Sequence, residues 1–232
     1  MVDSSVGRAP EEYFSLKWGY ATILFLCVVL GTSALAAYTS PQTWWGALEE
    51  NGPVELLSVV LWLCVSLAVL SRCKLDTIGT SVMVTFVAFA AREADLHKAF
   101  SSDSFFKLRF YTSGEFGLEQ MLFGIVAVVL LAVIAISVFA LFRFIFLRGG
   151  WRTAFGQVMV VGAGLLLATK AADRLPSILR VDYDLQIGPE IAAALRAFEE
   201  TGELMVSFLF LVAFAWFNKT ARFNGRPLRS GK

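Results

Sequence analysis

Long runs of apolar residues, each close to twenty positions or longer, alternate with short polar segments along this 232-residue chain. A helix of about 20 apolar residues crosses the roughly 30 Å hydrocarbon layer of a bilayer. The pattern therefore predicts an all-α, polytopic membrane protein, a bundle of six transmembrane helices in one domain that covers residues 1–232. The predicted spans are residues 18–38, 53–71, 77–98, 118–147, 153–173 and 195–217.

The composition supports a membrane location. Hydrophobic residues make up 57% of the chain and charged residues 17%, and the mean hydropathy is +0.66. Soluble domains carry about 25% charged residues, so a soluble enzyme, a secreted disulfide scaffold and a disordered chain are excluded. A formal net charge of +1 gives no basis for a nucleic-acid partner. Cys27, Cys64 and Cys73 form no C-x-x-C pair and are interpreted as small apolar residues.

The distribution of Lys and Arg predicts the orientation. When the N-terminus is placed in the cytoplasm, twelve of the twenty basic residues fall on the cytoplasmic side, including those of the tail Lys219–Lys232. The first outer loop then contains no basic residue. Because short cytoplasmic loops carry an excess of Lys and Arg, both termini are predicted to be cytoplasmic. The apolar run at 18–38 is too long for a signal peptide and is interpreted as a first span.

The acidic residues gather on the opposite, outer side, which holds fifteen of the nineteen, many of them at helix ends. A charged side chain in a bilayer costs at least about 2.5–3.5 kcal/mol unless it meets water or a partner. Carboxylates brought to one depth by several helices therefore predict a shared polar cavity at the periplasmic end. The helix dipole explains acids that open helices, but not Glu93, Asp95 and Asp173 at helix C-termini.

A divalent metal ion is one predicted occupant of that cavity. Glu93 and His97 are four residues apart, which places a carboxylate and the only imidazole on one face of a predicted helix. Helix bundles hold metals with Glu and His in this general manner. Mostly oxygen ligands favour Ca²⁺, Mg²⁺ or Mn²⁺ over Zn²⁺. The predicted ligands are Glu93, His97, Asp173, Glu200 and Glu203.

Three functions stay open at this point, and the sequence does not decide whether the chain is an enzyme. The first is a metal-assisted enzyme acting on lipid or another membrane substrate, with Glu55 as a ligand or general base. Arg92, Lys98 and Arg174 would hold an anionic headgroup. The second is a cation- or proton-coupled transporter or channel, although the cytoplasmic halves of the spans offer few polar residues to line a path. The third is a structural accessory subunit held together by ion pairs.

Several short motifs resemble an uncharacterised family of bacterial multi-pass inner-membrane proteins. The motifs are Glu50-Asn51-Gly52-Pro53-Val54-Glu55, Arg92-Glu93-Ala94-Asp95-Leu96-His97-Lys98, Asp173-Arg174 and Glu199-Glu200-x-x-Glu203. The resemblance runs in order through most of the chain. It implies a location in the bacterial inner membrane and supplies no reaction. Membrane hydrolases of the ceramidase and adiponectin-receptor type are not similar, because they need several histidines.

Overall fold

The computed structural model describes residues 27–35, 39, 52–96, 108–112 and 117–216. Helices account for 89% of these residues and no strand occurs among them, which confirms the all-α prediction. Residues 27–35 are helical. The labelled elements are α3 (Pro53–Arg72), α4 (Thr77–Glu93), α6 (Leu108–Thr112), α7 (Leu118–Phe142), the π-helical turn η1 (Arg143–Leu147), the 3-10 turn η2 (Gly150–Arg152), α8 (Ala154–Asp182) and α9 (Pro189–Trp216).

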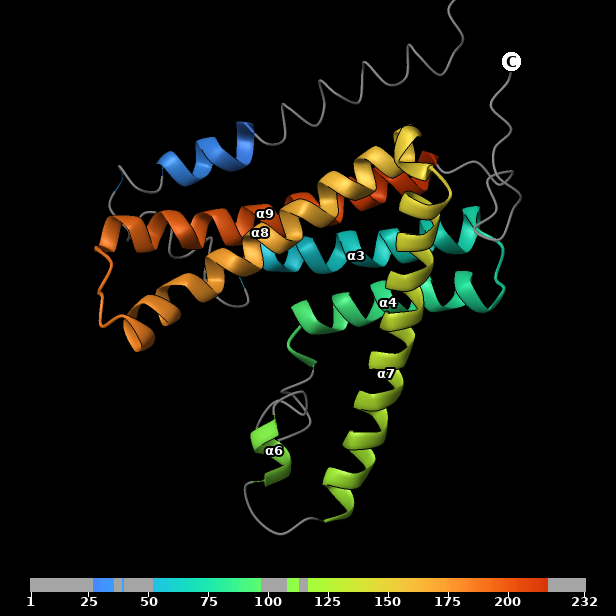
Figure 1. The fold of residues 1–232 in the computed structure, drawn as a ribbon, viewed down its shortest axis with the longest axis horizontal. Helices are drawn as coiled ribbons and strands as arrows, with labels where there is room; N and C mark the ends of the chain where they lie inside the picture. Colours follow the sequence, from blue (N-terminus) through green and yellow to red (C-terminus); the bar gives the residue numbers. More distant parts are fainter. Residues whose placement is uncertain (1–26, 36–38, 40–51, 97–107, 113–116, 217–232) are drawn as a thin grey trace, which may run out of the picture.

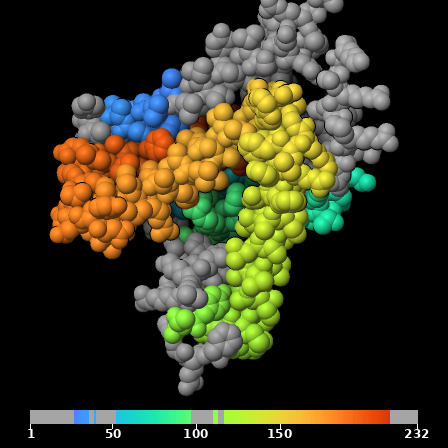
Figure 2. Space-filling view, in the orientation of Figure 1, coloured from blue at the N-terminus to red at the C-terminus, as the bar shows by residue number. Residues whose placement is uncertain are grey.

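Four helices, α3, α4, α8 and α9, run side by side and form the body of the molecule (Figure 1). Helix α9 packs against both α8 and α3, and α3 also packs against α4. Helix α7 runs across these four and contacts them chiefly through α4. Its first half extends away from the body, as Figure 2 also shows, with α6 beside it. There Phe110 packs against Phe123 at a ring separation of 6.0 Å.

Among the described residues, three helices are long and apolar enough to cross a membrane: α3, α7 with η1, and α8. Their mean hydropathies are 2.3, 3.2 and 1.5, and they coincide with the predicted spans at 53–71, 118–147 and 153–173. Helices α4 and α9 also form where spans were predicted. However, α4 has only 17 residues, and several glutamates interrupt the apolar character of α9. The fold is thus an all-helical one with three long apolar helices.

The C-terminal end of α4 differs from the prediction. The helix stops at Glu93, and Asp95 has a φ of +50°, in the left-handed region. The predicted continuous helix as far as Lys98 is therefore wrong. The shared helical face that was predicted for Glu93 and His97 depends on that continuous helix. His97 and Lys98 themselves lie outside the described residues.

Helices α8 and α9 are both longer than predicted. Helix α8 continues past the predicted end at residue 173 to Asp182, and α9 begins at Pro189, six residues before the predicted start at 195. Pro176 removes one backbone donor inside α8, but the helix continues through it. Proline at the start of α9 is in a favourable position, because the first amide of a helix has no partner within it.

Aromatic rings fill the middle of the body between α3, α4 and α9. Trp62 stacks on Phe86 with ring centroids 5.5 Å apart, and Phe210 meets the two rings edge-on at 5.7 and 5.8 Å. All three side chains are buried. Each lies seven residues, or two helical turns, from a glutamate on its own helix. We refer to Trp62, Phe86 and Phe210 as the aromatic floor.

Candidate functional site

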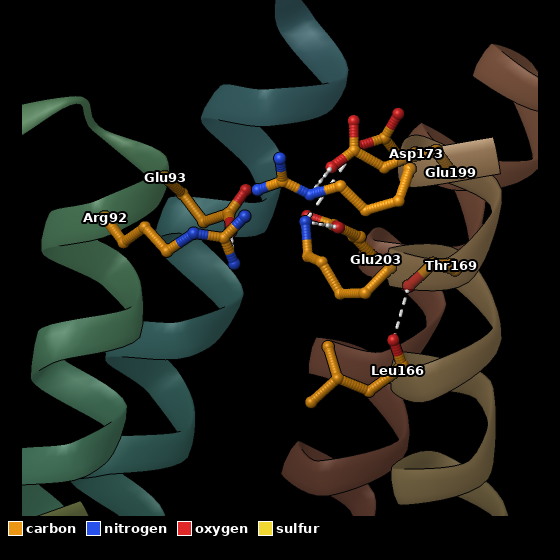
Figure 3. A network of polar contacts seen from close by, with 9 residues as sticks. Arg92, Glu93, Leu166, Thr169, Asp173, Glu199 and Glu203 are labelled. Carbon is orange, nitrogen blue, oxygen red and sulfur yellow. Dashed lines mark hydrogen bonds and ion pairs between the residues drawn. The ribbon is translucent and has the colours of Figure 1, made fainter. Parts of the chain in front are cut away.

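Close packing of α8 and α9 brings a lysine to a row of glutamates. Gly202 of α9 faces Thr169 of α8, and a Cβ at position 202 would overlap the Thr169 methyl group. The absence of a side chain there lets the helices approach closely. Lys170, the next residue of α8, forms an ion pair with Glu203 and lies 3.9 Å from the Oε1 of Glu199 (Figure 3).

Helices α3 and α4 supply carboxylates from the other side. Glu93 ends α4, its side chain is only 11% exposed, and its Oε1 lies 3.6 Å from the Nη1 of Arg92. Figure 3 shows Arg92 and Glu93 reaching from α4 towards Glu203 on α9. Glu93 is within electrostatic range of Glu203, Lys170 and also Glu55 on α3. Four helices therefore contribute charged side chains to one region.

The acidic side chains that the four helices bring to this region form one group, which we call the carboxylate cluster. Its members interact electrostatically with one another across α3, α4, α8 and α9. Its members are Glu55, Glu93, Asp173, Glu199, Glu200 and Glu203.

Positive charge is distributed unevenly around the cluster. Among the described residues, Lys170 is the base that reaches its interior, and its side chain is 31% exposed. The side chains of Arg92 and Arg174 are 46% and 77% exposed, so these residues form the rim. Arg174 lies 3.5 Å from Asp173, and Arg196 is also exposed. Six carboxylates thus share this region with one partly buried ammonium group, which lies against Glu199 and Glu203. Arg92 and Arg174 lie against Glu93 and Asp173 from more exposed positions.

Glu203 is the most constrained member of the cluster. Its side chain is 12% exposed, and its buried Oε1 accepts no hydrogen bond from the described residues. The ammonium group of Lys170 is therefore the charge that stabilises this oxygen. A buried carboxylate that loses its only partner becomes costly, since neither water nor a donor replaces the lost interaction.

The aromatic floor closes the region below the cluster. Trp62 follows Glu55 by two turns of α3, and Phe86 and Phe210 stand at the same helical distance from Glu93 and Glu203. Because these rings pack directly on one another, the polar region is bounded towards the middle of the body. The cluster is therefore approached from the ends of the helices.

The structure gathers most of the residues that the sequence selected. Glu55, Glu93, Asp173, Glu200 and Glu203 join the cluster, and Arg92 and Arg174 stand at its rim. Within the described part of the chain, no three acidic, thiol or imidazole groups lie close enough together to hold a metal ion. Because His97 lies outside that part, the metal site stays a prediction.

Two residues that matter in this geometry were not selected as site residues. They are Lys170 of α8 and Glu199 of α9. A stronger signal was present for Lys170, because a lysine inside an apolar helix is rare and usually faces a partner or a polar interior. Glu199 lies one turn before Glu203, so its participation follows from the same helical face.

Comparison with known proteins finds no match: no family model, curated protein or solved structure is significantly similar to the chain. The predicted membership of a bacterial inner-membrane family therefore stays a prediction.

Proposed function

We propose that the chain is an integral protein of a bacterial inner membrane whose carboxylate cluster binds a cation. In this proposal the chain crosses the membrane in the six predicted spans, and both termini lie in the cytoplasm. The observation that carries it is the charge imbalance, because the six carboxylates of the cluster outnumber the one partly buried lysine and the more exposed Arg92, Arg174 and Arg196 around them. Uncompensated charge of one sign in a region of low dielectric is relieved by uptake of protons or of a divalent cation.

The aromatic floor favours binding from one side over conduction. A channel or transporter needs a second polar route on the far side of the cluster. The stacked rings of Trp62, Phe86 and Phe210 occupy the middle of the body, where such a route would run. The buried hydroxyls beyond them, such as Ser66, donate to carbonyls of their own helix. These features support a binding site that opens at one membrane face.

A metal-assisted enzyme acting on lipid is the narrower form of this proposal. The exposed guanidinium groups of Arg92 and Arg174 favour it, because arginine recognises phosphate by paired, charge-assisted hydrogen bonds. Glu55 would then serve as a ligand or general base, and a bound metal ion would polarise an ester or phosphoryl oxygen. The alternative is a structural accessory subunit that binds no cation. In that case the charged residues form an ion-pair network that holds the helices together.

Thermal unfolding of the purified full-length protein tests cation binding. Ca²⁺, Mg²⁺, Mn²⁺ or Zn²⁺ at about 100 times its Kd should raise the Tm by roughly 5–10 °C over protein treated with chelator. If protons are the bound cation, metals will have no effect and the stability will rise as the pH falls. Glu93→Gln combined with Glu203→Gln should abolish either response.

Glu190→Gln provides the matched control. Glu190 lies on α9 as well, but it is exposed in the first turn, outside the cluster. The variant should respond to cations as the unmodified protein does. A Tm that is indifferent to all four metals and to pH would overturn the proposal and favour the structural subunit.

A further inference from the structure

Two of the three long apolar helices meet at one corner of the molecule. Helix α7 with η1 ends at Leu147, and α8 begins at Ala154, so six residues separate the two. If both helices cross the membrane, so short a connection lies at its surface. The inference below rests on this membrane location alone and is independent of cation binding at the carboxylate cluster.

The corner is built as a fixed turn. Gly149 has a φ of +71°, a conformation that favours glycine. Gly150 packs against the ring of Phe144, where a Cβ would come within 2.6 Å of the ring. The Thr153 hydroxyl caps α8 by accepting a hydrogen bond from the amide of Gly156 at 3.1 Å. These contacts hold the side chains of the corner in a defined arrangement.

Basic and aromatic side chains cover the outside of this turn. Arg143 and Arg152 are exposed, and the guanidinium of Arg152 lies 5.1 Å from the ring centroid of Trp151, itself 49% exposed. No carboxylate among the described residues forms an ion pair with either arginine. The sequence contains no acidic residue between Glu119 and Asp173. Arg143 and Arg152 therefore carry positive charge that no carboxylate in the described part of the chain pairs with.

We propose that the corner of residues 143–153 binds the headgroups of anionic phospholipids. Arginine matches the geometry of a phosphate group, and tryptophan prefers the boundary between headgroups and hydrocarbon. The exposed side chain of Leu147, 69% accessible, would enter the acyl region beside Trp151. Each basic residue near an anionic membrane surface strengthens the attraction to that surface roughly fivefold.

Fluorescence quenching by brominated lipids tests the proposal with the full-length chain in nanodiscs. One preparation contains dibrominated phosphatidylglycerol and the other the same fraction of dibrominated phosphatidylcholine. The emission of Trp151 is obtained as the difference between the unmodified protein and Trp151→Phe. We expect the anionic lipid to quench this emission several-fold more strongly than the zwitterionic lipid does. Arg143→Gln/Arg152→Gln should remove this preference, whereas Arg180→Gln, an exposed arginine near the end of α8, should keep it.

Equal quenching by the two lipids, or a preference that survives the double substitution, would overturn the proposal. If the double variant does not assemble, ionic strength replaces it, because high salt screens exposed charges. A preference of the unmodified protein that disappears at 1 M salt supports the inference, and one that persists contradicts it. Cation-dependent changes in Tm belong to the carboxylate cluster and test the proposed function separately.

Discussion

Lys170 of α8 forms an ion pair with Glu203 of α9, next to the point where Gly202 lets the two helices approach each other. The backbone contact and the charge contact therefore depend on each other. Any change that separates α8 from α9 also leaves Glu203 without the charge that stabilises it. This coupling makes the cluster sensitive to substitutions that carry no charge.

Removing one partner of the ion pair should cost more than removing both. Lys170→Met leaves the buried carboxylate of Glu203 uncompensated and should reduce the free energy of unfolding by about 3–5 kcal/mol. The lower end of that range is expected, since Lys170 is partly exposed. Lys170→Met/Glu203→Met should recover most of the loss. Denaturant unfolding in detergent measures both, with Arg180→Met as control. A double variant less stable than either single variant would contradict this reasoning.

A methyl group at position 202 should weaken the packing of α8 on α9. Gly202→Ala drives a Cβ into the Cγ2 of Thr169 and should destabilise the protein by about 1–3 kcal/mol. Thr169→Ser removes only that methyl group and keeps the hydroxyl bonded to the carbonyl of Leu166. The combination Gly202→Ala/Thr169→Ser should therefore be more stable than Gly202→Ala alone. Gly164→Ala is the control, because a Cβ there meets nothing within 4 Å. An equal cost at both glycines would contradict the prediction.

A hydrogen bond between buried hydroxyls joins α7 to α4. Thr85 donates to Ser137 at 2.9 Å, and Ser137 donates to the carbonyl of Val133. In a double-mutant cycle of Thr85→Val and Ser137→Ala, we expect a coupling of about 0.6 kcal/mol, and not above roughly 1.7. Ser71→Ala, which removes an exposed hydroxyl bonded within α3, should have little effect. Zero coupling would show that apolar packing alone positions α7.

Cys73 should react slowly with alkylating reagents. Burial, together with the carboxylate of Asp76, raises the pKa of the Cys73 thiol to about 11. The thiolate fraction at pH 8 is then about one in a thousand, and the rate should increase up to that pKa. Asp76→Asn should accelerate the reaction and keep the hydrogen bond that caps α4. Iodoacetamide kinetics in a Cys27→Ala/Cys64→Ala background measure the rate. Ser71→Cys in a cysteine-free background is the exposed reference. Equal rates at positions 71 and 73 would contradict the assignment.

Cysteine labelling in intact cells tests the proposed orientation. Leu147→Cys and Tyr183→Cys place exposed thiols near opposite ends of α8. With both termini in the cytoplasm, a membrane-impermeant maleimide should label position 183 in intact cells and position 147 only after the membrane is breached. The reverse pattern would move the carboxylate cluster to the cytoplasmic face.

The sequence predicts well what depends on run length and local charge. The apolar runs place α3, α7 and α8, because a helix must be long and uninterrupted to cross hydrocarbon. The acids at helix ends also predict that α3, α4, α8 and α9 share a carboxylate cluster. The left-handed backbone at Asp95 was missed, since asparagine and aspartate adopt it without a distinct sequence pattern.

The arrangement of the helices in space was harder to predict from the sequence. Helix α7 is apolar on every side, so its sequence specifies no face and no crossing direction. Its position depends on contacts such as Thr85 with Ser137, which are far apart in the chain. The meeting of Gly202 with Thr169 is likewise a property of two helices together. Residue spacing within one helix cannot reveal it.

The position of Lys170 in the chain has a consequence for biosynthesis. Glu55 and Glu93 are synthesised before this lysine, which follows Glu93 by 77 residues. At the usual rates of translation, about 4–15 s pass between them. During that interval the hairpin of α3 and α4 presents carboxylates whose interior counter-charge does not yet exist. These side chains must stay in water or hold protons until α8 and α9 arrive, so assembly of the cluster is one of the last steps in the maturation of the chain.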